Sequence, residues 1–400
     1  MKNTTVTAPK GFLAAGISCG IKKSGNKDLG IISCPTGAKA AAVFTTNKVV
    51  SAAVTICKKH SKSPSIEAVV VNSGNANTCT GKPGIKNAEA MCKTAAQLVD
   101  AKPNQILVAS TGIIGHQLPM EKITTGIILA AVQLANSPKA GDDFARSIMT
   151  TDTKCKQAFK TVNISGAEIR IAGTTKGAGM IGPNMATTLC FITTDANITK
   201  PLLQKALKDA VGQSLNKLTV DGHQSTNDTA IILASGLASN KTINKTDLRY
   251  EKFSAALSDL CTGLAKQMAL NAEGATRMFT VVAGGAASKA EAAKAARAVA
   301  DYDLVKCAIH GGDPNWGRII CALGSCGVKI NPNKLSCSIG NTVVFRNGRP
   351  VKFDPKKVSK IISQKEHIIM VNLGTGKHSD FCYGCDMSKD YVTINADYHT

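Results

Sequence analysis

Thr187 is a candidate nucleophile because of the residues on either side of it. It follows a glycine-rich segment, Lys176–Ala186, and opens a stretch, 186–194, in which β-type residues alternate. A threonine hydroxyl is a weak nucleophile at neutral pH and needs a base. If the chain breaks before Thr187, the new α-amino group, with a pKa of roughly 7.7–8.0, lies on the same residue and can be that base. The simpler interpretation, a threonine that merely opens a strand, stays open at this point.

The glycine-rich segment matches a dinucleotide-binding fingerprint only in bare form, Gly177-x-Gly179-x-x-Gly182. That fingerprint needs a following helix whose N-terminus holds the pyrophosphate, whereas here Pro183 and a strand pattern follow. The Gly-Lys pairs at 81–82 and 376–377 lack the Ser or Thr that a phosphate loop requires. We therefore exclude nucleotide binding and expect the loop to bring flexible backbone up to the start of the strand.

Four further segments carry polar residues that could contribute to a site. Ala109–Gly115 ends a strand in a glycine-flanked turn, which can aim backbone N–H groups at an oxyanion but is also an ordinary β-turn. Asp221–Asp228 is densely polar, as a capped loop would be. Asp313–Arg318 holds the only Trp and fits a rigid turn, and Asn395–Thr400 is a well-patterned chain end.

Alternating strand and helix patterns would position these residues. Apolar periodicity predicts strands at 68–72, 105–109, 167–172, 186–194 and 278–282. It predicts helices at 87–99, 123–134, 200–218, 253–271 and 286–303. The first two strands run directly into glycine-bearing turns. The class predicted is mixed α and β, with sheets that are not all parallel.

Composition narrows the classes of function. The 400 residues are 44% hydrophobic, and no apolar run approaches the roughly 18 residues that cross a bilayer, so we expect a cytoplasmic protein without a membrane partner. The net charge of +21 comes from dispersed lysines, with few arginines and only 4% aromatics, which argues against nucleic-acid binding. The fourteen cysteines are scattered singly, as reduced thiols are. Cys382 and Cys385 form the one C-x-x-C, and with no second pair it does not predict a metal site.

Taken together and in order, these motifs resemble the ornithine acetyltransferase (glutamate N-acetyltransferase) family of arginine biosynthesis. The resemblance runs from end to end, through Pro9–Phe12, Val43–Asn47, Val71–Asn77, Ser110–Gly112, Met149–Thr153, Lys176–Thr187, Thr219–Gly222, Ser225–Thr229, Asp313–Arg318 and Ile394–Thr400. It implies an α+β fold, an N-terminal-nucleophile-like αββα sandwich with a smaller C-terminal α/β lobe. The expected domains are 1–285 and 286–400, and autoproteolysis between Ala186 and Thr187 would give an α chain, 1–186, and a β chain, 187–400.

The resemblance also implies roles for individual residues. Thr187 would be the nucleophile that forms an acetyl-enzyme, and Thr111 and Gly112 would form the oxyanion hole. Substrate would be bound by Thr150, Lys176, Thr187, Glu273, Asn395 and Thr400. The reaction implied is ping-pong transfer of acetyl from N2-acetylornithine to glutamate, without a cofactor or a metal. Acetyl-CoA stays open as a second acetyl donor, and a heterotetramer of two α and two β chains is expected.

Two departures from the family pattern leave substrate preference open. Asn271-Ala272 stands where the family usually carries Asp-Gly before the glutamate, and Phe381–Asp386 lacks a usual Trp. Two rival functions stay open at this point. A self-cleaving aminopeptidase or amidase of related fold would use water as acceptor, and a lysine-rich binding protein would have no catalytic activity.

Overall fold

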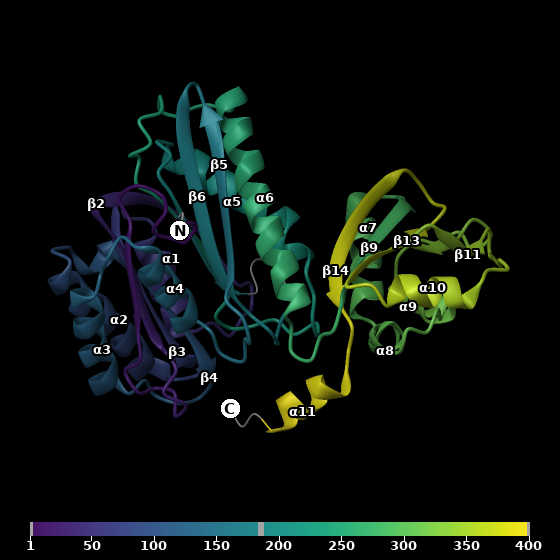
Figure 1. Ribbon diagram of the computed structural model, residues 1–400, viewed down its shortest axis with the longest axis horizontal. Helices are drawn as coiled ribbons and strands as arrows, with labels where there is room; N and C mark the ends of the chain where they lie inside the picture. Colours follow the sequence, from purple (N-terminus) through teal and green to yellow (C-terminus); the bar gives the residue numbers. More distant parts are fainter. Residues whose placement is uncertain (1–2, 183–187, 398–400) are drawn as a thin grey trace.

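The structure is a computed structural model that describes residues 3–182 and 188–397. Two lobes lie side by side in Figure 1, and each is built on one mixed sheet. The first lobe contains strands β1 (Leu13–Ile17), β2 (Leu29–Phe44), β3 (Ile66–Asn75), β4 (Ile106–Ile113), β5 (Lys156–Ile164), β6 (Ala167–Lys176), β7 (Leu189–Thr194) and β8 (Thr229–Ala234). Its helices are α1 (Ala52–His60), α2 (Gly81–Leu98), α3 (Met120–Val132), α4 (Pro138–Ser147), α5 (Lys200–Gln213) and α6 (Leu248–Leu270), with short 3₁₀ turns at Pro103–Gln105 and Leu215–Lys217.

The long strand β2 joins the two halves of the first sheet, whose order is β4-β3-β2-β8-β7-β6-β5, with β1 also on β2. Its first half pairs with β1 and β3 and its second half with β8, and the register shifts between Ser33 and Ala38. Pro35, which lacks an N–H, and Gly37, at φ +73°, lie at this shift. The strand therefore changes partners at a bulge and serves both half-sheets.

Both faces of the central strands β7 and β8 are buried. Leu189, Phe191, Ile231 and Leu233 belong to the core shared with β1–β4 and α1–α4, and the Phe144 ring of α4 meets that of Phe191 edge to face at 5.5 Å. The alternate residues, such as Cys190 and Ile232, pack against α5 and α6. The two halves of this sheet thus form the two β layers, and helices cover them, as an αββα sandwich requires. The predicted α+β class is confirmed.

The second lobe is built on a six-stranded sheet with the order β12-β11-β10-β13-β9-β14. Its strands are β9 (Met278–Ala286), β10 (Ser336–Ile339), β11 (Thr342–Arg346), β12 (Arg349–Pro350), β13 (Glu366–Asn372) and β14 (His378–Cys385). Its helices are α7 (Lys289–Asp301), α8 (Asp303–Gly311), α9 (Trp316–Ser325) and α10 (Pro355–Ile362). The last helix, α11 (Lys389–Asp397), leaves this lobe and returns toward the first (Figure 1).

Several predicted boundaries differ from the structure; α2, for example, begins at Gly81 instead of 87, and α6 begins at Leu248 instead of 253. Two further differences have a clear physical reason. The helix expected over 200–218 ends at Gln213, because Ser214 leaves helical geometry (φ −133°, ψ −84°) and its hydroxyl bonds to the Ala210 carbonyl at 2.6 Å. The boundary expected at 286 falls at the end of β9, yet β9 pairs with β13 and β14 from Met278 onward. The second sheet therefore begins at Met278, and the division into domains stays a prediction.

Candidate active site

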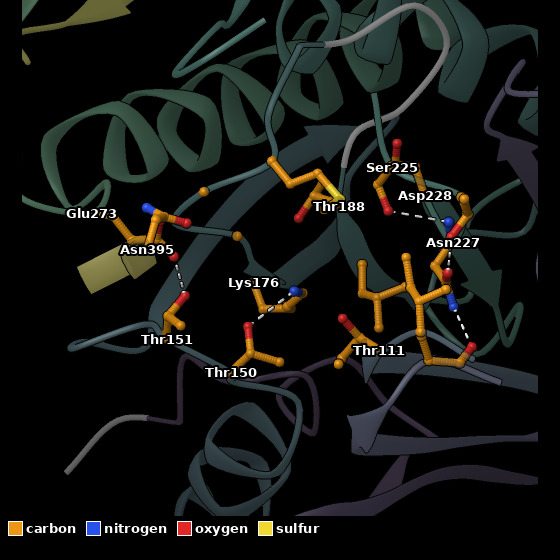
Figure 2. A pocket seen from close by; sticks show the side chains of 18 residues that line it. Thr111, Thr150, Thr151, Lys176, Thr188, Ser225, Asn227, Asp228, Glu273 and Asn395 are labelled. Atoms are coloured by element: carbon orange, nitrogen blue, oxygen red, sulfur yellow. Dashed lines mark hydrogen bonds between the residues drawn. The ribbon is translucent and has the colours of Figure 1, made fainter. Parts of the chain in front are cut away.

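A cavity of about 250 Å³ lies in the first lobe where several strand ends meet (Figure 2). The ends of β4 and β6, the start of β7 and several loops contribute to its wall, together with α11. Its lining residues are Ala76, Thr111, Gly112, Ile114, Thr150, Thr151, Lys176, Gly177, Gly179, Met180, Thr188, Leu189, Ser225–Asp228, Glu273 and Asn395. The fold therefore brings segments from the whole length of the chain to one hollow.

Thr111 and Gly112 form the part of the wall where β4 runs beside β3. Gly112 has φ +128°, and a Cβ on it would lie 2.4 Å from the Gly74 carbonyl carbon. Only glycine fits there, because the backbones of the two strands approach so closely. Thr111 is 7% exposed, and in Figure 2 its side chain lies by the same hollow as Lys176.

Asn227 fixes the two strand ends around this wall. Its amide nitrogen donates to the carbonyls of Ala76 and Ser110, both at 2.7 Å, and its amide oxygen accepts from the Thr78 hydroxyl at 2.8 Å. One buried side chain thereby joins the ends of β3 and β4 to a loop that lies more than a hundred residues later in the chain. A fully bonded buried network of this kind makes a rigid wall.

Lys176 supplies a positive charge at the end of β6. Its Nζ donates to the Thr150 hydroxyl at 3.2 Å. Burial lowers the pKa of this lysine, and the nearby carboxyls of Asp152 and Asp228 oppose that shift. The two predicted binding residues, Thr150 and Lys176, are therefore in direct contact.

A buried ion pair between Lys156 and Asp152 lies near Lys176. Lys156 Nζ contacts Asp152, and both side chains are at most 1% exposed. Asp152 also accepts from the backbone N–H groups of Gly177 at 2.9 Å and Thr150 at 3.1 Å. Burial opposes ionisation, but the charges of Lys156 and Lys176 and these hydrogen bonds hold the pKa of Asp152 at about 2.

Glu273 supplies the opposite charge in the cavity wall. Its Oε1 accepts from the Thr151 hydroxyl at 2.5 Å and its Oε2 from the Asn395 amide at 2.8 Å. A Cβ on Gly179 would lie 2.2 Å from Oε2, so the glycine-rich loop presses against this carboxylate. Asn395 of α11 thus reaches the first lobe, as the resemblance implied for the chain end.

The start of β7 is part of the same wall, since Thr188 and Leu189 both line the cavity. The Thr188 hydroxyl lies 2.9 Å from that of Thr175, and the Thr229 N–H donates to the Thr188 carbonyl at 2.8 Å. The predicted cleavage residues Ala186 and Thr187, and the predicted binding residue Thr400, lie outside the described residues.

Asp228 is a residue of the wall that sequence reasoning passed over. Its side chain is buried, and its Oδ2 has no hydrogen-bond partner within 3–182 and 188–397. Burial raises the pKa of this carboxyl well above its ordinary value, and the charge of Lys176 only partly opposes this. The polar density of Asp221–Asp228 was the signal available, but it did not distinguish a capped loop from a cavity wall.

The other polar motifs lie away from the cavity. Asn315 caps α9 by accepting from the Arg318 N–H, which confirms a structural turn at 313–318. Cys382 and Cys385 are buried in β14, and the fourteen cysteines are all free. No group of three His, Cys, Asp or Glu side chains suited to a metal ion occurs within the described ranges. No helix in the described part of the chain is long and apolar enough to cross a membrane.

A cavity at strand ends whose wall carries both a lysine and a glutamate is typical of an enzyme that acts on a small polar molecule. The chain belongs to the ArgJ family, whose model matches residues 13–400. A relative from Symbiobacterium thermophilum, the arginine biosynthesis bifunctional protein ArgJ, is 43% identical over 99% of this chain and 98% of its own length. The protein of the same name from Dehalococcoides mccartyi is 44% identical over 99% and 97%.

A crystal structure of the arginine biosynthesis bifunctional protein ArgJ from Bacillus halodurans is also similar. It is 41% identical with a TM-score of 0.51, and the match covers 52% of this chain and 98% of that one. These findings confirm the predicted family and its acetyl-transfer function in arginine biosynthesis.

Proposed function

We propose that the chain cleaves itself between Ala186 and Thr187, and that Thr187 then transfers acetyl from N2-acetylornithine to glutamate. The observation that carries this proposal is the cavity itself. The start of β7, the Thr111–Gly112 wall and the pair Lys176 and Glu273 all face one hollow.

In the cleavage step, the Thr187 hydroxyl attacks the Ala186 carbonyl carbon and the peptide C–N bond breaks. The nitrogen takes up the hydroxyl proton and becomes the α-amino group, and water then hydrolyses the ester to the Ala186 carboxylate and the free hydroxyl. The coverage of the Bacillus halodurans chain supports this proposal. It spans 52% of this chain, and residues 187–400 make up 214 of 400.

In the transfer steps, the α-amino group removes the proton as the hydroxyl attacks the acetyl carbonyl. Thr111 and Gly112 stabilise the oxyanion, ornithine leaves with a proton on its nitrogen, and acetyl stays on Thr187. The amine of glutamate then attacks this ester and restores the hydroxyl. Each acceptor enters after the previous product leaves, which is ping-pong kinetics.

Charge complementarity explains the proposed binding roles. Lys176 with Thr150 suits an α-carboxylate, and Glu273 with Asn395 suits an ammonium group, since each pair presents the opposite charge. An amino acid carries both groups. Thr400 would complete the site from the chain end, and no cofactor is needed because the acetyl group travels on Thr187.

A denaturing gel tests this function. We expect two bands of roughly equal size, and a single 41.6 kDa band for Thr187→Ala. Thr111→Ala should cleave and bind substrate yet lose about 100-fold in kcat, the cost of one oxyanion donor. An active enzyme that stays full-length would refute the proposal, and unchanged turnover in Thr111→Ala would remove that residue from the oxyanion hole.

We also propose that acetyl-CoA is a second donor, which the word bifunctional in the relatives' names supports. Formation of N-acetylglutamate from acetyl-CoA and glutamate without acetylornithine is the test. A cytoplasmic heterotetramer of two α and two β chains remains our proposal for the assembly. Native mass spectrometry should then give twice the mass of one 41.6 kDa precursor, plus the one water molecule that each cleavage adds.

A further inference from the structure

The motif Thr219–Gly222 holds the glycine-rich loop from behind, although it lines no part of the cavity. The Asp221 carboxylate accepts from two successive backbone N–H groups of that loop, Met180 at 2.6 Å and Ile181 at 2.8 Å. The Val220 N–H donates in return to the Ile181 carbonyl at 2.8 Å. The segments 180–181 and 220–221 are thereby fixed to each other.

The loop needs this support, because its geometry is costly. Met180 has φ +53°, a backbone conformation that residues other than glycine rarely adopt. Gly182 lies so close to Gly222 that a Cβ on it would be 2.2 Å from the Gly222 carbonyl carbon. The Asp221 side chain is itself only 4% exposed, so its hydrogen bonds are sheltered from water.

The second lobe in turn fixes the motif. The Thr219 N–H donates to the Tyr383 carbonyl of β14 at 2.9 Å, and the Thr219 hydroxyl bonds to Asp301 of α7. Lys306, which is 1% exposed, donates to the Val220 carbonyl. A continuous set of hydrogen bonds therefore connects the second lobe to the loop that precedes the proposed cleavage bond.

We propose that Asp221 is a positioning residue for self-cleavage, because it fixes the backbone at Met180 and Ile181 and so the direction in which the chain enters the segment that is cut. This inference rests on the proposed function. An intramolecular attack gains its rate from correct geometry, and a loop released five residues upstream of Ala186 loses that geometry.

The experiment compares the rate at which purified precursor splits in the full-length protein and in Asp221→Asn. The asparagine keeps the size of the side chain and one acceptor oxygen, but its NH₂ group meets one of the two backbone N–H groups as a second donor. We expect cleavage to slow at least tenfold. Tyr391→Phe is the matched control, since it removes only the 3.1 Å hydrogen bond from the Tyr391 hydroxyl to Asp221 and should cleave within twofold of the parent.

Stability measurements distinguish a positioning role of Asp221 from a purely structural one. The unfolding midpoint of Asp221→Asn is measured in the uncleaved Thr187→Ala background, and Val344→Ala, a fully buried residue of β11, shows how far instability alone slows cleavage. Slowing of Asp221→Asn beyond that of Val344→Ala supports the proposal. Slowing no greater than in Val344→Ala, or equal slowing in Tyr391→Phe, overturns it while leaving self-cleavage intact. A parent chain that never splits overturns both proposals.

Discussion

Replacing Asp152 by asparagine should destabilise the first lobe strongly, because it leaves Lys156 charged and buried without its partner. The pKa of Asp152 lies at about 2 instead of 3.8, and this difference corresponds to about 2 kcal/mol of stability at neutral pH. Loss of one member of a buried pair adds the cost of the stranded charge, so we expect a loss of roughly 3–5 kcal/mol in the free energy of unfolding.

Urea denaturation at pH 7 measures this loss, with Thr187→Ala as the common uncleaved background. The double variant Asp152→Asn/Lys156→Met should regain most of the stability, because neither member of the pair then carries a charge. In the parent, the contribution of Asp152 is complete above pH 3.8 and is lost as the pH falls toward 2, since the folded-state pKa is the lower one. A single variant as stable as its background, or a double variant no better than the single one, would refute the reasoning.

Three further substitutions test the walls of the cavity. Gly179→Ala places a Cβ 2.2 Å from Glu273 Oε2, so KM for ornithine-type substrates should rise at least tenfold in a steady-state assay, and an unchanged KM would show that the carboxylate yields freely. Gly112→Ala, whose Cβ would meet Gly74 at 2.4 Å, should lower kcat far more than it raises KM, and an equal effect on both would contradict an oxyanion role. Asp228→Asn should gain stability relative to the parent as the pH rises above about 4, because the pKa of the buried carboxyl is raised and its ionisation favours the unfolded chain. Urea titrations at pH 4 and pH 8 measure the stability difference between variant and parent, and a difference that is equal at the two pH values would count against this reasoning.

The sequence predicted the elements that carry strong periodicity and missed those decided by tertiary contacts. The strand expected at 68–72 lies within β3 as an unbroken buried run, and the helix expected at 253–271 corresponds to α6, whose buried residues recur at a helical period. The end of α5 at Gln213 depends on a Ser214 side chain that bonds back to Ala210. The membership of β9 in the second sheet depends on pairing with β13, some ninety residues later, which no local pattern records.

The residues of the site also divide into those that the sequence predicted and those that it did not. Family motifs led to Thr150, Lys176, Glu273 and Asn395, and the structure brings these four to one cavity. The pair of Asp152 and Lys156 was missed although the two residues lie four apart, because they flank the start of a strand and no helical spacing draws attention to them. Burial alone makes Asp228 unusual, and burial is a property of the folded chain.

Intact mass spectrometry of the enzyme mixed with N2-acetylornithine, in the absence of glutamate, tests the central claim most directly. We expect a chain that begins at Thr187 and carries one acetyl group, and we expect glutamate to remove that group. A full-length chain that is active, or an acetyl group on any residue other than Thr187, would contradict the account.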